Sequence, residues 1–141
     1  MEIFNELFSK YNYLERSKKP SITIEDIEST VNFKLPLDYI SYLQKYLGFE
    51  GFIGKEYLQL WDIDELLETN RDYGIFQNLP KTLAIGGNGN GEFIAIESAD
   101  QGNYRVVLSP FIDLNSQSHI EVGTSFTNFL NRLDNGHEWF K

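Results

Sequence analysis

The sequence contains no cysteine among its 141 residues. Disulfide bonds, thiol catalysis and thiolate metal sites are therefore excluded, and folding requires no oxidising compartment. The chain also lacks an apolar run of about twenty residues, the length that crosses a bilayer. Its first fifteen residues carry acids at Glu2 and Glu6 and no basic signal-peptide region. We therefore expect a cytoplasmic protein that does not associate with a membrane.

Basic residues are scarce. Twelve Lys and Arg residues stand against 21 Asp and Glu residues, which gives a net charge of −9 at pH 7. Such a surface repels the phosphates of nucleic acids, so we expect no direct binding to DNA or RNA. A basic protein partner would instead be attracted and steered towards it.

Residue patterns that support catalysis are scarce as well. The only histidines, His119 and His137, are not spaced to pair with each other or with two carboxylates, and we expect both to be solvated. The nucleophile-elbow pattern G-x-S-x-G is absent, and Gly123-Thr124-Ser125 is better explained as the start of a helix. The sequence therefore predicts a protein without enzymatic activity and without a cofactor.

The most distinctive motif is a glycine-rich segment between two apolar runs, LAIGGNGNGEFIAIE at residues 83–97. Glycine adopts positive φ at little cost, so we expect a tight turn that joins two strands. The glycines of this turn are Gly86, Gly87, Gly89 and Gly91. A dinucleotide-binding loop would open a helix and a P-loop would end in Gly-Lys-Ser/Thr, whereas this segment ends in Glu92 and another strand.

Calcium binding is the other chemistry that the glycine-rich segment suggests. Asn88, Asn90 and Glu92 alternate as oxygen ligands would. The segment offers only one carboxylate, however, and the EF-hand spacing is absent. The sequence therefore favours a structural turn without a metal.

Hydrophobic periodicity divides the chain into a helical third, a region of strands and a final helix. It predicts helices over residues 2–15, from a Thr23–Asp26 capping box to residue 31, and from Pro36 at the first helical position to a C-cap at Gly48. Strands are predicted over residues 52–53, 57–61, 83–85, 92–97, 104–108 and 119–122, with a turn at residues 100–103. Asp62 is expected to cap a helix that runs to about Tyr73, and Thr124 or Ser125 a last helix that stops at Gly136.

This order of elements predicts an α+β fold. We expect a single compact domain over residues 1–141, mainly an antiparallel sheet packed with N-terminal and C-terminal helices. The helix over residues 2–15 would be a leading extension of that domain. The tyrosines of the third helix, Tyr39, Tyr42 and Tyr46, are expected to pack in the core.

Acidic residues are densest at the helix that begins near residue 62. The candidates for partner binding there are Asp62, Asp64, Glu65, Glu68 and Asp72, with Glu92 of the glycine-rich segment as a further candidate. Asp64, Glu68 and Asp72 are spaced four apart, so their carboxylates share a helix face and repel one another. The face is either simply solvated or an anionic docking surface, on which nearby tyrosine and tryptophan side chains could act as anchors. Glycoside hydrolysis is a third option, but carboxylates on one exposed helix lack the facing geometry that it requires.

Several motifs, in this order, resemble the SUKH superfamily. They are Leu35-Pro36-Leu37-Asp38-Tyr39 before a helix, Leu60-Trp61 before the acidic helix, Leu79-Pro80 before Leu83-Ala84-Ile85-Gly86-Gly87-Asn88-Gly89, and Gly123-Thr124-Ser125-Phe126 at the last helix. The structural positions of the resemblance are Pro36, Trp61, Gly86, Gly87, Gly89, Gly91, Ser125 and Phe126.

The resemblance, which covers residues 22–136, implies a compact α+β fold and a function without catalysis. Members of that superfamily mostly serve bacteria as immunity proteins that bind and neutralise polymorphic or contact-delivered toxins, many of them nucleases. Fungal relatives regulate cell-wall synthesis and signalling. The resemblance thus implies a protein toxin as the partner, and the charge of this chain favours a basic one. A regulatory scaffold that binds a signalling or cell-wall protein is the alternative.

Overall fold

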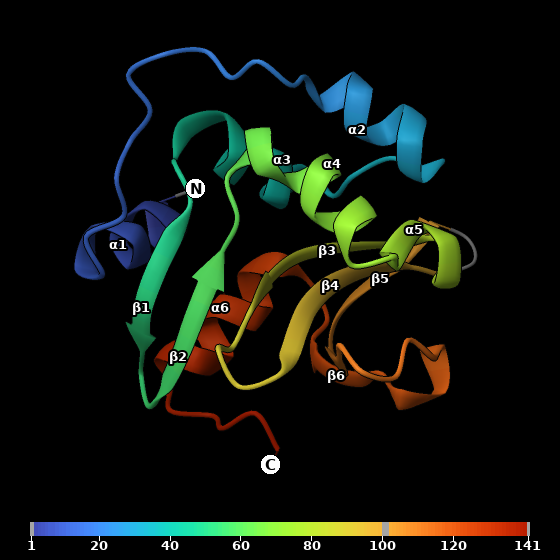
Figure 1. Ribbon diagram of the computed structural model, residues 1–141. Coiled ribbons are helices and arrows are strands. Elements are labelled where there is room, and N and C mark those ends of the chain that lie inside the picture. Colours follow the sequence, from blue (N-terminus) through green and yellow to red (C-terminus); the bar gives the residue numbers. More distant parts are fainter. Residues whose placement is uncertain (1, 100–101, 141) are drawn as a thin grey trace.

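An antiparallel sheet of six strands organises the computed structural model, which describes residues 2–99 and 102–140 (Figure 1). Each strand pairs with the next one along the chain, so the order in the sheet is the order in the sequence. The strands are β1 (Phe49–Ile53), β2 (Glu56–Leu60), β3 (Thr82–Gly87), β4 (Glu92–Ser98), β5 (Tyr104–Pro110) and β6 (Ile120–Gly123). The predicted α+β fold with a mainly antiparallel sheet is confirmed. Two residues of the expected turn at 100–103, Asp100 and Gln101, lie outside the described residues.

Helices precede, interrupt and follow the sheet. They are α1 (Glu2–Lys10), α2 (Ile24–Val31), α3 (Leu37–Lys45), α4 (Ile63–Asp72), α5 (Ile75–Asn78) and α6 (Phe126–Asp134), with a 3₁₀ turn η2 (Ser116–Ser118). Figure 1 shows α2, α4 and α5 gathered at one end of the strands, whereas the turns between β1 and β2 and between β3 and β4 lie at the other end. Helix α5 was not predicted, because one turn is too short to show a helical period.

Aromatic side chains fill the main core between the sheet and the helices. Tyr39 and Tyr42 of α3 are almost fully buried, as predicted from their spacing. Phe8 of α1 is fully buried and packs its ring 4.6 Å from that of Tyr46, while Tyr13 stacks on Phe49 at 4.0 Å. The N-terminal segment therefore supplies part of the core.

The prediction of one helix over residues 2–15 is wrong beyond Lys10. Helix α1 ends at Lys10, and Asn12 adopts a left-handed conformation with φ 61°. The chain then runs extended, so that Leu14 O accepts the amide of Leu47 and the amide of Arg16 donates to Lys45 O, both at 2.8 Å. These bonds link sequence-distant segments, and a local periodicity cannot reveal them.

The predicted limits of the third helix also need correction. Pro36 is the N-cap of α3, with ψ 143°, and not its first helical residue. The helix ends at Lys45 with an extended Tyr46 as its C-cap, so Gly48 does not cap it. Leu37 is exposed, because with 3.6 residues per turn it lies on the opposite side of α3 from the buried Tyr39, Tyr42 and Leu43.

Three predicted helix starts are confirmed by their hydrogen bonds. Thr23 and Asp26 form a complete capping box on α2, and Asp62 forms one with Glu65 on α4. Ser125, one of the two predicted caps, accepts the amide of Asn128 at the start of α6.

The glycine-rich segment is a strand-to-strand turn, as predicted, but only its second half has the expected backbone. Gly89 and Gly91 have positive φ, whereas Gly86 and Gly87 belong to β3 and do not. Gly86 lies at a bulge opposite Ile94, and a Cβ atom there would lie 1.9 Å from Gln59 O of β2. The close approach of β2 and β3, and not the turn, is what requires glycine at this position.

Candidate functional site

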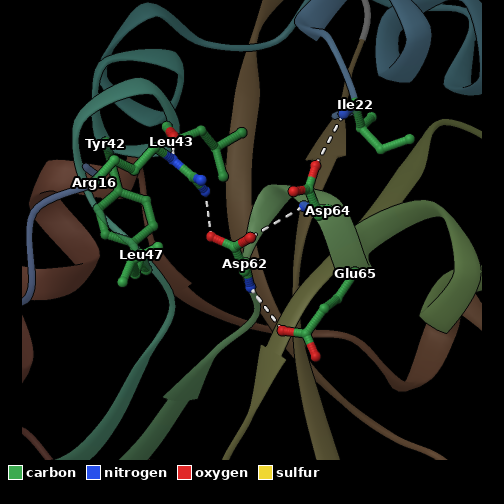
Figure 2. A network of polar contacts seen from close by, with 8 residues as sticks. All are labelled: Arg16, Ile22, Tyr42, Leu43, Leu47, Asp62, Asp64 and Glu65. Atoms are coloured by element: carbon green, nitrogen blue, oxygen red, sulfur yellow. Dashed lines mark hydrogen bonds and ion pairs between the residues drawn. The ribbon is translucent and has the colours of Figure 1, made fainter. Parts of the chain in front are cut away.

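The acidic helix α4 begins in a fixed network of polar contacts (Figure 2). Asp62 accepts the amide of Asp64 at 3.3 Å, and Glu65 Oε1 accepts the amide of Asp62 at 3.2 Å. The carboxylate of Asp62 also forms an ion pair with the guanidinium of Arg16. Because its carboxylate is bonded to Arg16 and to backbone amides of the first turn, and its side chain is only 20% exposed, Asp62 holds the helix in place and offers little to a binding partner.

Arg16 reaches α4 from the extended segment that follows α1. Its side chain is 8% exposed, and its Nε donates to Leu43 O of α3 at 3.1 Å. Tyr42 lies beside it in Figure 2, and its hydroxyl donates to Leu47 O at 2.9 Å. Burial, with the nearby Asp62 carboxylate, raises the pKa of Tyr42, so the hydroxyl remains a donor.

Asp64 is also engaged, on the flank of the helix. Its Oδ1 accepts the amide of Ile22 at 2.9 Å, which ties the segment before α2 to α4. The segment over residues 16–22 is thus fastened to α4 at both of its ends, by Arg16 and by Ile22.

The outermost face of α4 carries three acids that share one side. Ile63, Leu66, Leu67 and Asn70 are buried, and with 3.6 residues per turn Glu65, Glu68 and Asp72 point directly away from them. All three residues are exposed, and Arg71 is the one base within this helix. The outward group is therefore Glu65, Glu68 and Asp72, and not the expected trio with Asp64.

Aromatic rings continue this acidic face. Trp61 and Tyr73, just before and just after α4, have rings parallel to within 8° and centroids 6.5 Å apart. Tyr73 is 51% exposed and packs on Phe111 at 4.4 Å. We name the surface formed by Trp61, Glu65, Glu68, Asp72 and Tyr73 the acid–aromatic face. The sequence suggested tyrosine and tryptophan anchors near the acidic helix but not which ones, because Trp61 and Tyr73 flank opposite ends of α4 and their rings meet only in the folded chain.

A buried asparagine fixes α4 against the sheet. Asn70 is fully buried, and its Nδ2 donates to Leu66 O at 2.8 Å and to Ala84 O at 2.9 Å. Its Oδ1 accepts the amide of Ala84 at 2.8 Å. The Asn70 side chain thus bonds both the amide and the carbonyl of Ala84 in β3, which fixes α4, and with it the acid–aromatic face, to the sheet.

Glu92 does not lie with the other acidic candidates. Its Oε1 accepts the side-chain amide of Asn88 at 2.8 Å, within the turn between β3 and β4. Asn88 Oδ1 in turn accepts the amides of Asn90 at 2.9 Å and Glu92 at 3.3 Å. Figure 1 places this turn at the end of the strands opposite α4. The hydrogen bonds give these residues a structural role in the turn.

The expectation that His119 is solvated is wrong. Its side chain is 0% exposed, and its Nδ1 lies 2.7 Å from Glu97 Oε2. Arg105, directly opposite Glu97 in the sheet, donates to the other carboxylate oxygen at 2.5 Å. Burial raises the pKa of Glu97, but the hydrogen bonds from Arg105 and His119 outweigh burial, so the pKa of Glu97 is lowered.

Over residues 6–99 and 102–140, no group of three or more Asp, Glu or His side chains is placed to hold a metal ion. In the same ranges no helix is long and apolar enough to cross a membrane.

A comparison with known families identifies the family of this chain. A family model described as the SMI1 / KNR4 family (SUKH-1) matches residues 21–132. That range contains α2 to α5, the whole sheet and most of α6, and therefore the whole acid–aromatic face. No curated protein matches the chain.

Proposed function

The chain belongs to the SMI1 / KNR4 family (SUKH-1), and from that membership we propose that it is a bacterial immunity protein. In this proposal it binds a polymorphic or contact-delivered toxin, of which a basic nuclease is the preferred kind, and neutralises it without catalysis, metal or cofactor. Family membership is consistent with an immunity-type protein, since proteins of this family are generally non-enzymatic immunity or regulatory proteins. In this proposal the neutralisation takes place in the cytoplasm.

The acid–aromatic face is the observation that supports a basic partner. Glu65, Glu68 and Asp72 present three exposed carboxylates on the outer side of one helix. Trp61 and Tyr73 lie beside them as partly exposed rings, the residue types that dominate the energetics of binding interfaces. The charges would accelerate and orient the encounter, and the rings would supply buried contact area.

We propose further that residues 1–141 act as one unit, although the family match begins at residue 21. Phe8 of α1 lies in the main core, and Arg16 holds the first turn of α4. The leading extension would therefore support the docking face without itself contacting the partner.

Rescue of growth tests the proposed function. The chain is co-expressed with the toxin domain encoded beside it, and we expect growth where the toxin alone prevents it. Failure to bind any neighbouring toxin domain would overturn the proposal. Binding to a cellular protein without rescue would instead favour the regulatory scaffold.

A charge-reversed variant tests the docking face. Glu68→Lys with Asp72→Lys should slow association with the toxin by about tenfold at low salt and less at high salt, because screening removes the steering. The matched control, Glu6→Lys with Glu121→Lys, makes the same change in net charge at exposed positions on α1 and β6. Equal association rates for the two variants would show that the acidic helix is not the docking surface.

A further inference from the structure

A hollow of about 350 Å³ adjoins the acid–aromatic face between β1, β2 and the first turn of α4. The side chains that matter for its chemistry are Glu50, Gln59, Trp61 and Glu65. None of its lining residues is a lysine, arginine or histidine. The hollow between β6 and the C-terminal segment differs, because it is lined by Arg132 and His137 as well as by acids.

Strand register explains why these side chains meet. Glu50 of β1 and Gln59 of β2 are directly opposite each other, so both side chains leave the same face of the hairpin. Trp61 follows Gln59 by two residues and emerges on that face as well. Helix α4 begins directly after Trp61, and its first turn brings Glu65 to the rim.

Glu50 and Glu65 each use one carboxylate oxygen in a hydrogen bond within the protein. Glu65 Oε1 accepts the amide of Asp62, and Figure 2 shows the second oxygen turned away from that amide. Glu50 Oε2 accepts the hydroxyl of Tyr57, and this hydrogen bond, with a smaller contribution from burial, raises the pKa of Tyr57. Within the described residues no donor is recorded for the second oxygen of Glu50 or of Glu65. Two oriented carboxylates thus face a hollow whose lining contains no cation.

The chemistry of this hollow matches a guanidinium group. A guanidinium carries five donors in a planar fork, which can bond two carboxylates at once. Its flat face also stacks on an indole ring, and Trp61 supplies that ring. An ammonium group is a compact charge without this planar match, and a metal ion would require more oxygen ligands than two carboxylates and an amide provide.

We propose that the hollow between Glu50, Trp61 and Glu65 receives an arginine side chain of the protein partner. The inference rests on the proposed function for the existence of a basic partner. The arginine would be an anchor of the interface, with its charge neutralised in the hollow while the acid–aromatic face contacts the surrounding surface.

The test uses the protein alone with a capped arginine, N-acetyl-arginine amide, followed by NMR at pH 7 and low salt. We expect saturable shifts of the Trp61 indole and the Gln59 side-chain amide. N-acetyl-citrulline amide has the same shape without the charge and should bind at least tenfold more weakly. Capped lysine should also bind more weakly, and binding equal to that of arginine would overturn the assignment of a guanidinium.

Two variants locate the binding. Glu50→Gln and Glu65→Gln remove one charge each and should weaken arginine binding at least threefold. Both should fold, because glutamine can still accept from Tyr57 and can still complete the capping box. Glu121→Gln, at the other hollow, is the control and should leave binding unchanged.

Absence of saturable shifts, equal binding of citrulline, or unchanged binding in both glutamine variants would overturn the proposal. The titration needs no partner, so its failure leaves a positive growth rescue standing. Conversely, if growth is not rescued but arginine binds, the proposed toxin neutralisation is refuted and the arginine-binding hollow remains supported.

Discussion

The ion pair between Arg16 and Asp62 should be a large single contribution to the stability of the docking face. Arg16→Met keeps most of the aliphatic stem but removes the donor to Asp62 and the donor to Leu43 O. The charge of Asp62, whose side chain is 20% exposed in the wild type, would then be bonded only to backbone amides.

The magnitude follows from the burial of the two side chains. Removing one partner of a buried pair costs about 3–5 kcal/mol, whereas an exposed pair contributes about 0–1 kcal/mol. Arg16 is nearly buried and Asp62 is about one-fifth exposed, so we expect Arg16→Met to lower the free energy of unfolding by about 2–3 kcal/mol. Asp62→Asn should cost a similar amount, because asparagine caps a helix as well as aspartate and only the ion pair is lost.

Urea unfolding of the two single variants and the double variant measures this interaction. The double variant should be more stable than the sum of the single losses predicts, with a coupling of about 1.5–2 kcal/mol. Lys45→Met is the control, because the Lys45–Glu15 pair spans 3.8 Å with side chains 47% and 65% exposed. It should cost less than about 0.5 kcal/mol. The reasoning is refuted if Arg16→Met unfolds within about 0.5 kcal/mol of the wild type, or if the two losses simply add.

Four further substitutions have defined outcomes. Asn70→Ala leaves both backbone groups of Ala84 without their side-chain partner and should cost about 2–4 kcal/mol in urea unfolding; a smaller loss than 1 kcal/mol would contradict the role of this bridge. Gly86→Ala places a Cβ atom 1.9 Å from a β2 carbonyl oxygen and should cost more than about 3 kcal/mol of unfolding free energy. Gly91→Ala points into open space at φ 93° and should cost about 1–2 kcal/mol. Urea unfolding of the two variants checks that the loss at Gly86 is the larger. Because the pKa of Glu97 is lowered below 4.5, its contribution to stability is present above that pH and is lost as pH falls through the folded-state pKa. Glu97→Gln should therefore be less stable at pH 7 and should lose less stability between pH 5 and pH 2, and parallel acid-unfolding curves for the two proteins would contradict this.

The local chemistry of the chain identified most of the elements. The caps at Thr23, Asp62 and Ser125 were predictable because a capping side chain bonds an amide two or three residues away. The strands were predictable from short apolar runs between turn residues. The limits of α1 and α3 were not predictable, because they depend on hydrogen bonds between segments that are distant in the sequence. Leu14 bonds Leu47, just after α3, and Arg16 bonds Lys45, the last residue of α3.

The candidate site was predictable as a region but not as a surface. The sequence located five acids near α4, and the structure divides them by their partners. Asp62 and Asp64 bond Arg16 and the amide of Ile22, whereas Glu68 and Asp72 face solvent. Those partners lie more than forty residues away along the chain, so no local pattern could assign them.

By itself, the sequence determined the α+β class, the excess of negative charge and the absence of thiol chemistry, since these depend on composition and on neighbouring residues. Only the tertiary structure decided that His119 is buried against Glu97, that Gly86 is required by a neighbouring strand, and that Glu50 and Glu65 face one hollow. Each of these depends on segments that are distant in the sequence and meet only when the sheet has formed. Binding chemistry of this kind depends on which polar atoms the folded chain brings to one hollow, and that is a property of the whole fold.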